Sequence, residues 1–250
     1  MKNYIKSEYF RIRKKKSSYI ITGILAILTV ALAIVLEYYS NTEPDFPYGN
    51  IKYYYSNVFA MSNFILALIC FLSVYLLGKD RLIIPTSISL GIKRKSIFIG
   101  KFIVTLIHFF IILLILGLVT YLSGQFILTD KSDTVTINFL ISLFNLLPIL
   151  LSALATCYSI TLILDNEIIA VIIVFIFYRG LALLIYGLTS VNEKISAIQD
   201  YIPASAMNKI LSDFMNGTVQ LNTANWLINL VLALLILIVG LKIVEKKDYN

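Results

Sequence analysis

Six apolar stretches, each long enough to cross a lipid bilayer, constrain this chain more than any other feature. They run over Tyr19–Leu36, Val58–Leu77, Phe102–Leu122, Asn138–Ile160, Ile168–Leu188 and Trp226–Val244. At about 1.5 Å per residue, a helix of about 18 residues spans most of the roughly 30 Å of hydrocarbon. Lipid offers backbone groups no hydrogen-bond partner, so each stretch is expected to be helical. The sequence predicts an all-α membrane protein with six transmembrane helices.

The lysines and arginines gather on alternate sides of these stretches. The ends and loops on the side of the N-terminal arm hold 16 of the 21 Lys and Arg residues, and the opposite loops hold four. Basic loops of this kind remain in the cytoplasm. We therefore expect both termini in the cytoplasm and a multi-pass protein of the cell membrane. Usage rich in Lys, Ile and Asn is typical of an AT-rich bacterium.

Composition and missing motifs exclude several classes. Only 14% of the residues are charged, against about 25% in soluble proteins, and the net charge of +7 flanks the apolar stretches. Membrane lipid, not nucleic acid, is the expected partner of that charge. The chain has no phosphate-binding loop, one histidine (His108) and two cysteines (Cys70 and Cys157) placed inside apolar stretches. We expect no enzyme activity, metal or cofactor of its own.

The chain divides into no soluble domains, so residues 1–250 are expected to form a single transmembrane domain. Residues 1–18 carry Ile5, Tyr9 and Ile12 at helical spacing among basic residues, which predicts an amphipathic elbow helix on the inner membrane face. The basic charges alone also fit a simple topology signal. The first stretch imitates a signal peptide, but its apolar run continues to Leu36, and we expect it to be retained. Residues 191–225 form an outer hairpin, in which an amphipathic helix follows Pro203 and ends near Gly217, at or dipping into the outer interface.

The loop 79–101 is the most informative polar segment. Pro85 suits the first turn of a helix, and Gly91 suits the left-handed position that ends one. The sequence predicts a short helix from about Pro85 to Leu90 at the cytoplasmic face, followed by a basic turn. Contact with lipid headgroups would account for the basic residues of the loop, but not for Pro85 and Gly91 at the two ends of the expected helix.

The string from Ser87 to Lys101 resembles the loop after the second helix in type-2 ABC transporter permeases, where Ser, Gly, Arg and Lys recur at similar spacing. The overall plan of elbow, six helices and long outer segment is also similar. Tyr201-Ile202-Pro203 resembles a short aromatic-aliphatic-proline element in the outer segment of small permeases of that family.

This resemblance implies a permease dimer, formed with an identical copy or a paralogue and bound to two cytoplasmic ATPase subunits that bind the ATP. The short helix would be a coupling helix seated in a groove of the ATPase. By carry-over, the ATPase-coupling residues would be Thr86, Ser87, Ile88, Leu90, Lys93 and Arg94, with a smaller second contact at Asp165 and Glu167.

The function expected from the resemblance is ATP-driven export. The chain is similar in size to small permeases of that family that export amphipathic or antimicrobial peptides. We therefore expect such peptides as the substrate, with lipids, ions and drugs as alternatives. Two other classes remain open: a non-transporting membrane assembly or sensor subunit, and an intramembrane enzyme. Copurification with an ATPase would distinguish an exporter subunit from these two other classes.

Arg179 lies near the middle of the fifth stretch, where an arginine costs about 2.5–3.5 kcal/mol to insert. It should therefore face protein or water. It is a candidate pathway or gating residue, and the structural alternative is a pair with Glu37 or with a helix-end carbonyl. Asn63, His108 and Asn145 also lie within stretches, where such residues more often join helices than bind a ligand.

Overall fold

The computed structural model describes residues 2–43, 45–77, 83–164, 166–189 and 202–247. These residues form helices joined by short connections, and no strand occurs among them. The helices are α1 Lys2–Arg13, α2 Lys16–Thr42, α3 Ile51–Ala60, α4 Ser62–Leu77, α5 Ile83–Ser89, α6 Arg94–Phe126, α7 Asp133–Ile163, α8 Glu167–Phe175, the π-helix η2 Ile176–Gly180, α9 Leu181–Thr189, α11 Pro203–Asn216 and α12 Thr223–Lys246. The all-α prediction is confirmed for this part of the chain.

Five segments of the described chain are long and apolar enough to cross a membrane: α2, α6, α7, the continuous run Ile168–Thr189 through η2, and α12. A sixth exists only if α3 and α4 count together, because they meet at a bend of 52°. This architecture is that of a multi-pass helical membrane protein.

The second predicted span, Val58–Leu77, is therefore not one straight helix. Ser56 Oγ and Asn57 Nδ2 both donate to the carbonyl oxygen of Tyr53, at 2.8 and 2.9 Å. Polar side chains that bond the preceding turn compete with the backbone and commonly bend or end a helix. This competition lies in the middle of α3, about one turn before the break at Met61.

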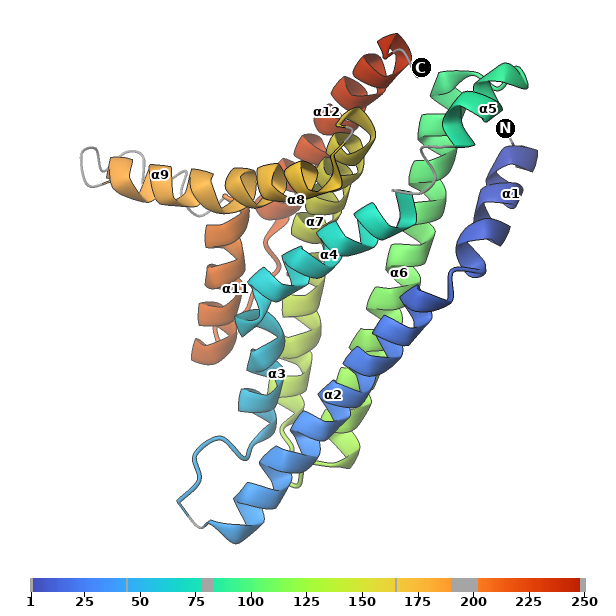
Figure 1. Cartoon of the computed structure of the whole chain (residues 1–250). Coiled ribbons are helices and arrows are strands. Elements are labelled where there is room, and N and C mark those ends of the chain that lie inside the picture. Colours follow the sequence, from blue (N-terminus) through green and yellow to red (C-terminus); the bar gives the residue numbers. More distant parts are fainter. Residues whose placement is uncertain (1, 44, 78–82, 165, 190–201, 248–250) are drawn as a thin grey trace.

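Helix α7 is the centre of the molecule. It packs most extensively against α12 and α4, and it also contacts α8 and α11, while α2 and α1 lie along α6 (Figure 1). Helices α7 and α12 approach each other closely at Gly240, where an added Cβ would lie 2.7 Å from Ser159 Oγ. A glycine therefore lets the two backbones meet.

Helix α11 does not present its apolar face to the surroundings. Met207, Ile210 and Phe214 are buried, and the helix packs against α3 and α7. Phe214 meets Phe59 of α3 with ring centroids 5.2 Å apart. Gly217 ends the helix with φ +72°, as its sequence position predicts. The amphipathic helix is confirmed, and in this chain other helices cover its apolar side.

The elbow segment is a helix, α1, held against the start of α6. Tyr4 covers Gly100, where an added Cβ would lie 2.8 Å from the Tyr4 ring. Lys101 Nζ lies 3.2 Å from the carboxylate of Glu8, and both side chains are almost fully buried. Arg11 pairs with the same carboxylate. An ion cluster thus fixes α1 to α6.

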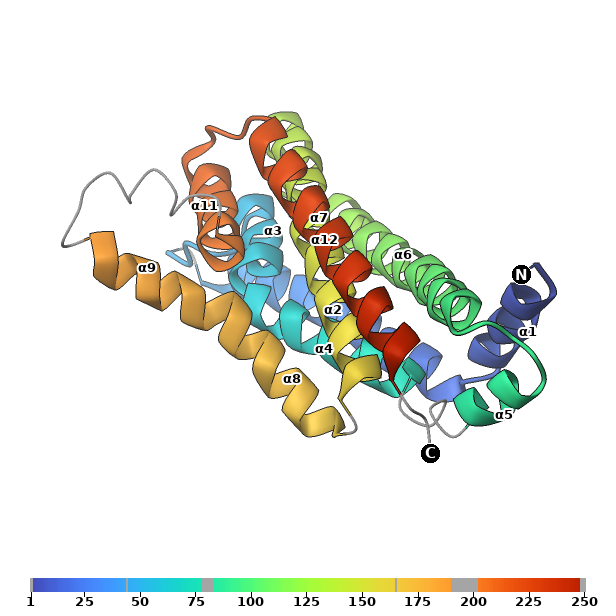
Figure 2. The same ribbon diagram turned by 90° about the horizontal axis from the view of Figure 1, so that it is seen from above.

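Helix α1, helix α5, the turn between α7 and α8, and the end of α12 lie at one end of the molecule (Figure 1). The run from α8 to α9 is oriented across the direction of α6. It lies on the opposite side of the bundle from α6 (Figures 1 and 2). Helix α9 touches little of the bundle beyond η2 and α11.

Candidate functional site

Helix α5 has the boundaries that its sequence predicts to within two residues. Pro85 lies in its first turn, where a missing backbone N–H costs nothing. At its end Gly91 adopts φ +83°, Gly91 N donates to Ile88 O at 2.9 Å, and Ile92 N donates to Ser87 O at 3.1 Å. This paired closure is a Schellman motif, which satisfies the last carbonyls of the helix. The short helix between proline and glycine is confirmed.

The predicted contact residues divide between two faces of α5. Ser87 is buried and its Oγ donates to Ile83 O at 2.9 Å, and Ile88 is half-buried. Thr86 and Lys93 are exposed, and Leu90 is 77% exposed. Thr86, Leu90 and Lys93 therefore lie on the exposed side of this segment, and we name them the α5 surface.

Below the α5 surface, the helix rests on the ends of three spans. Ile84 packs in a small apolar cluster with Phe98 of α6, Leu162 of α7 and Val244 of α12. A hollow of about 220 Å³ lies under α5, lined by members of this cluster and by Arg94. Force applied to α5 would therefore reach α6, α7 and α12 directly.

Arg94 faces the protein rather than a partner. Its Nη1 donates to Glu245 O at 2.9 Å, in the last turn of α12. Two lysines do the same at this end: Lys15 Nζ donates to Leu76 O of α4 at 2.7 Å, and Lys247 Nζ donates to Ile163 O of α7 at 2.9 Å. Each cation caps a helix whose negative dipole end lies there.

The second predicted contact is only partly described. Asp165 lies outside the described residues, and of Glu167 only the backbone is described, as the first residue of α8. Asn166 between them caps α8, because its Oδ1 accepts from Ile168 N at 2.9 Å and from Ile169 N at 3.2 Å.

Arg179 lies in the π-helix η2 and is exposed on the surface of the single chain. The pairing with Glu37 is wrong, because Glu37 accepts from Asn41 Nδ2 and from Thr129 N, each at 3.1 Å. Within the described residues, Arg179 has neither an ion pair nor a helix-end carbonyl. A π-helix widens one turn of an α-helix and is frequent at functional sites.

A chain of buried hydrogen bonds links α12, α7 and η2. Asn229 Nδ2 donates to Asn225 Oδ1 at 2.7 Å, Ser152 Oγ donates to Asn229 Oδ1 at 3.1 Å, and Tyr178 Oη donates to Ser152 Oγ at 3.0 Å. Sequence reasoning missed this chain. The available signal was the spacing of four residues between Asn225 and Asn229, which puts both carboxamides on one helix face.

The intramembrane polar residues join helices, as expected. His108 Nε2 lies 2.6 Å from Ser18 Oγ, which links α6 to α2. Asn145 Nδ2 donates to Gln220 O at 2.8 Å, which links α7 to the segment before α12. The side chain of Asn63 lies outside the described part of the chain.

In the ranges that the structure describes, no three His, Cys, Asp or Glu side chains meet in a way that could hold a metal ion. No family model matches the chain, and a comparison with curated proteins finds no match. The fold and its surfaces thus define the protein as a helical membrane protein with a short positioned helix at one end.

Proposed function

We propose that this protein is the permease subunit of an ATP-driven exporter of amphipathic peptides in a bacterial cytoplasmic membrane. The observation that carries the proposal is α5: a seven-residue helix, closed by a Schellman turn, that exposes Thr86, Leu90 and Lys93 beside the ends of three spans. A helix this short is fixed by packing, not by its own stability. An exposed leucine flanked by a lysine suits the apolar, acid-rimmed groove of a soluble partner.

The packing below α5 supports a coupling role. A cytoplasmic ATPase that pulled or rotated α5 would act through Ile84 on α6, α7 and α12, and through Arg94 on the end of α12. Because α12 and α7 pack along most of their lengths, the movement would reach the opposite side of the membrane. In this proposal the cytoplasmic partner binds and hydrolyses the ATP.

Arg179 supports a dimer. An arginine near the bilayer centre that has no ion pair with any described residue needs a further protein surface or water. Helices α8 and η2 pack on the bundle through one side, while α9 makes few contacts with it. A second copy or a paralogue would cover the exposed side of this run. Arg179 would then lie in the seam between two permeases, where a transport pathway runs.

The test is copurification from the native cell in mild detergent, with the bound subunit identified by its sequence and assayed for ATP hydrolysis. We expect an ATPase with a phosphate-binding loop to copurify with the unaltered protein. Leu90→Asp should abolish that association, because it places a charge at the centre of the α5 surface.

The matched control is Leu221→Asp, an exposed leucine (54%) between α11 and α12, away from α5. It should leave the association intact. Equal ATPase recovery with Leu90→Asp and with Leu221→Asp would overturn the assignment of α5. A stable, monodisperse protein that never copurifies with an ATPase would overturn the exporter function itself.

A further inference from the structure

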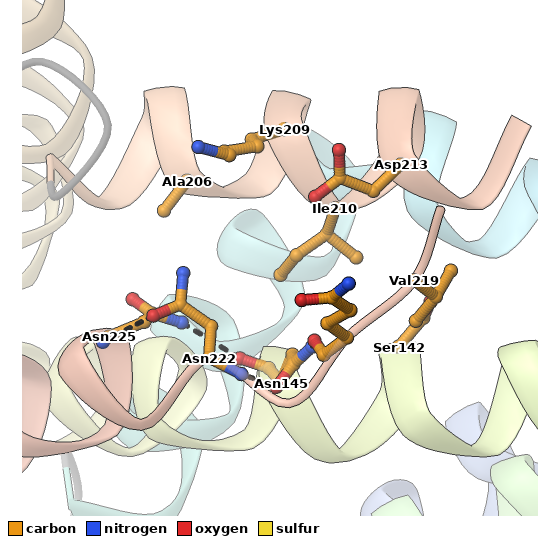
Figure 3. Close-up of a pocket in the computed structure, with 10 residues that line it drawn as sticks. Ser142, Asn145, Ala206, Lys209, Ile210, Asp213, Val219, Asn222 and Asn225 are labelled. Atoms are coloured by element: carbon orange, nitrogen blue, oxygen red, sulfur yellow. Dashed lines mark hydrogen bonds between the residues drawn. The ribbon is translucent and has the colours of Figure 1, made fainter. Parts of the chain in front are cut away.

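A polar hollow lies between α7, α11 and the start of α12, away from α5 (Figure 3). It encloses about 360 Å³ when the open space at its mouth is included, so a ligand bound there would lie largely in the open mouth. Its lining includes Ser142 of α7, Lys209 and Asp213 of α11, and Gln220 and Asn222 of the connection to α12.

The floor of the hollow holds a hydroxyl group without a partner. Ser142 is 1% exposed, and its Oγ makes no hydrogen bond. Leaving a buried polar group unsatisfied costs about 1–3 kcal/mol, so such a group deserves an explanation. It lines a cavity that opens outward, and a bound ligand would supply the missing bond.

The wall above it carries a carboxylate that is also available. Asp213 is half-buried, lines the hollow, and has no ion pair or side-chain hydrogen bond with any described residue. Gln220 belongs to the same lining and adds a carboxamide oxygen, whereas Asn222 Oδ1 already accepts from Asn225 N at 2.9 Å. An arrangement of one carboxylate, one hydroxyl and one carboxamide favours a ligand rich in N–H donors.

The hollow is held open by its own frame. Asn145 Oδ1 accepts from Asn222 N at 3.1 Å, and Asn225 Nδ2 donates to Asn145 O at 3.0 Å. These bonds fix α12 to α7 directly behind the cavity (Figure 3). A site whose walls are already bonded loses little freedom when a ligand enters, which favours binding.

We propose that this hollow binds the ammonium group of an α-amino amide, the chemistry shared by a peptide N-terminus and a free amino-acid amide. The ammonium group pairs with Asp213 and donates to Ser142. The neighbouring carbonyl oxygen of the ligand lies toward Lys209, one turn earlier on α11. The site lies in the permease chain alone, so its test is independent of any ATPase.

The chain carries its own reporter for this test. Trp226, the single tryptophan, follows Asn225 of the lining, and its ring lies 4.5 Å from that of Phe144 on α7. Alaninamide added to the purified full-length protein in detergent should change the tryptophan fluorescence in a saturable way. N-acetylalaninamide, which lacks the ammonium group, should bind at least about tenfold more weakly, because a charge-assisted bond is lost.

Two variants locate the site. Asp213→Asn should raise the Kd for alaninamide by about tenfold or more. Ser142→Ala should raise that Kd by about threefold or more. Ser212→Ala on the exposed side of α11 and Asp130→Asn between α6 and α7 are the matched controls, and both should bind as the unaltered protein does.

A trialanine peptide separates the two sources of the amine. Binding equal to that of alaninamide would show that the hollow accepts a peptide N-terminus, and weaker binding would show a site for the free amide; both results support an ammonium site. Equal responses to alaninamide and its acetylated form would overturn the proposal. The proposal would also be overturned if Asp213→Asn still gave a fluorescence response and bound alaninamide with an unchanged Kd.

Discussion

At the scale of single residues, the ion cluster of Glu8, Arg11 and Lys101 holds charged groups away from water. Lys101 is 2% exposed and Glu8 is 4% exposed. Removing charges from water is unfavourable unless they remain paired. Glu8 is the only acidic residue among the first 18, and it satisfies two cations from two different helices.

Replacing Glu8 tests this balance. Glu8→Gln would leave Lys101 buried without its carboxylate, and we expect the free energy of unfolding in detergent to fall by about 3–5 kcal/mol. Thermal or denaturant unfolding measures the change. Lys6→Gln, on the exposed side of α1, should stay within about 0.5 kcal/mol of the unaltered protein. A loss no greater than that of Lys6→Gln would show that the pair adds nothing.

At the scale of helices, the basic residues at one end of the molecule do more than set orientation. Helices α4, α7 and α12 all end there, and each exposes the negative end of its dipole. Lys15, Lys247 and Arg94 come from outside those helices and bond their last carbonyls. The bias that keeps positive charge on one side of a membrane therefore also supplies the caps of the helices that end on that side.

Removing one cap should have a measurable and moderate effect. We expect Arg94→Gln and Lys247→Gln each to lower the free energy of unfolding by about 0.3–2 kcal/mol, with smaller differences at high salt. The comparison is Lys95→Gln, which removes an equal charge from an exposed position next to Arg94. If Lys95→Gln destabilised the protein as much as Arg94→Gln, net charge rather than capping would be the cause.

Much of the fold could be predicted from local sequence signals. Contacts between residues far apart in the sequence could not be predicted in this way. Apolar length predicted six spans, of which five are long apolar helices in the described chain and the sixth is the bent pair α3 and α4. Pro85 with Gly91 predicted α5. Each of these signals is contained in one segment. The inward turn of Ser87 depended on where α5 rests. The bond from Glu8 to Lys101 joins residues 93 positions apart, and nothing near Glu8 indicates its partner.

The candidate site shows the same limit. The exposed position of Leu90 and Lys93 follows from the short helix, so sequence reasoning placed them well. Arg94 was expected to face outward with them, and its bond to α12 depends on the fold. Ser142 and Asp213 are unremarkable in sequence, since only the packing of α11 on α7 brings them to one cavity.

At the scale of the whole molecule, the run from α8 to α9 packs on the bundle through α8 and η2 but leaves α9 with few contacts. It carries Arg179 near its centre, and Leu183 beside it is 73% exposed. In the proposed dimer, this run meets its counterpart. The opposite side of the bundle, along α6, would face lipid.

Cysteine cross-linking in native membranes distinguishes these sides. Leu183→Cys should form a disulfide-linked dimer on mild oxidation, whereas Leu114→Cys, on α6 and 62% exposed, should not. The native Cys70 and Cys157 are fully buried and should not interfere. Cross-linking that is absent at Leu183, or as strong at Leu114, would contradict the proposed seam; a heterodimer would appear as a link to a second chain.

The attachment of α1 to α6 also sets an order of events during synthesis. The N-terminal arm leaves the ribosome before the residues that receive it, and 93 residues separate Glu8 from Lys101. At about 5–20 residues per second, the arm waits roughly 5–20 s for that lysine. During this interval Lys101 is not yet available to Glu8, so the arm directs the first helix before it is docked on α6. It becomes a structural part of the bundle only when the third span arrives.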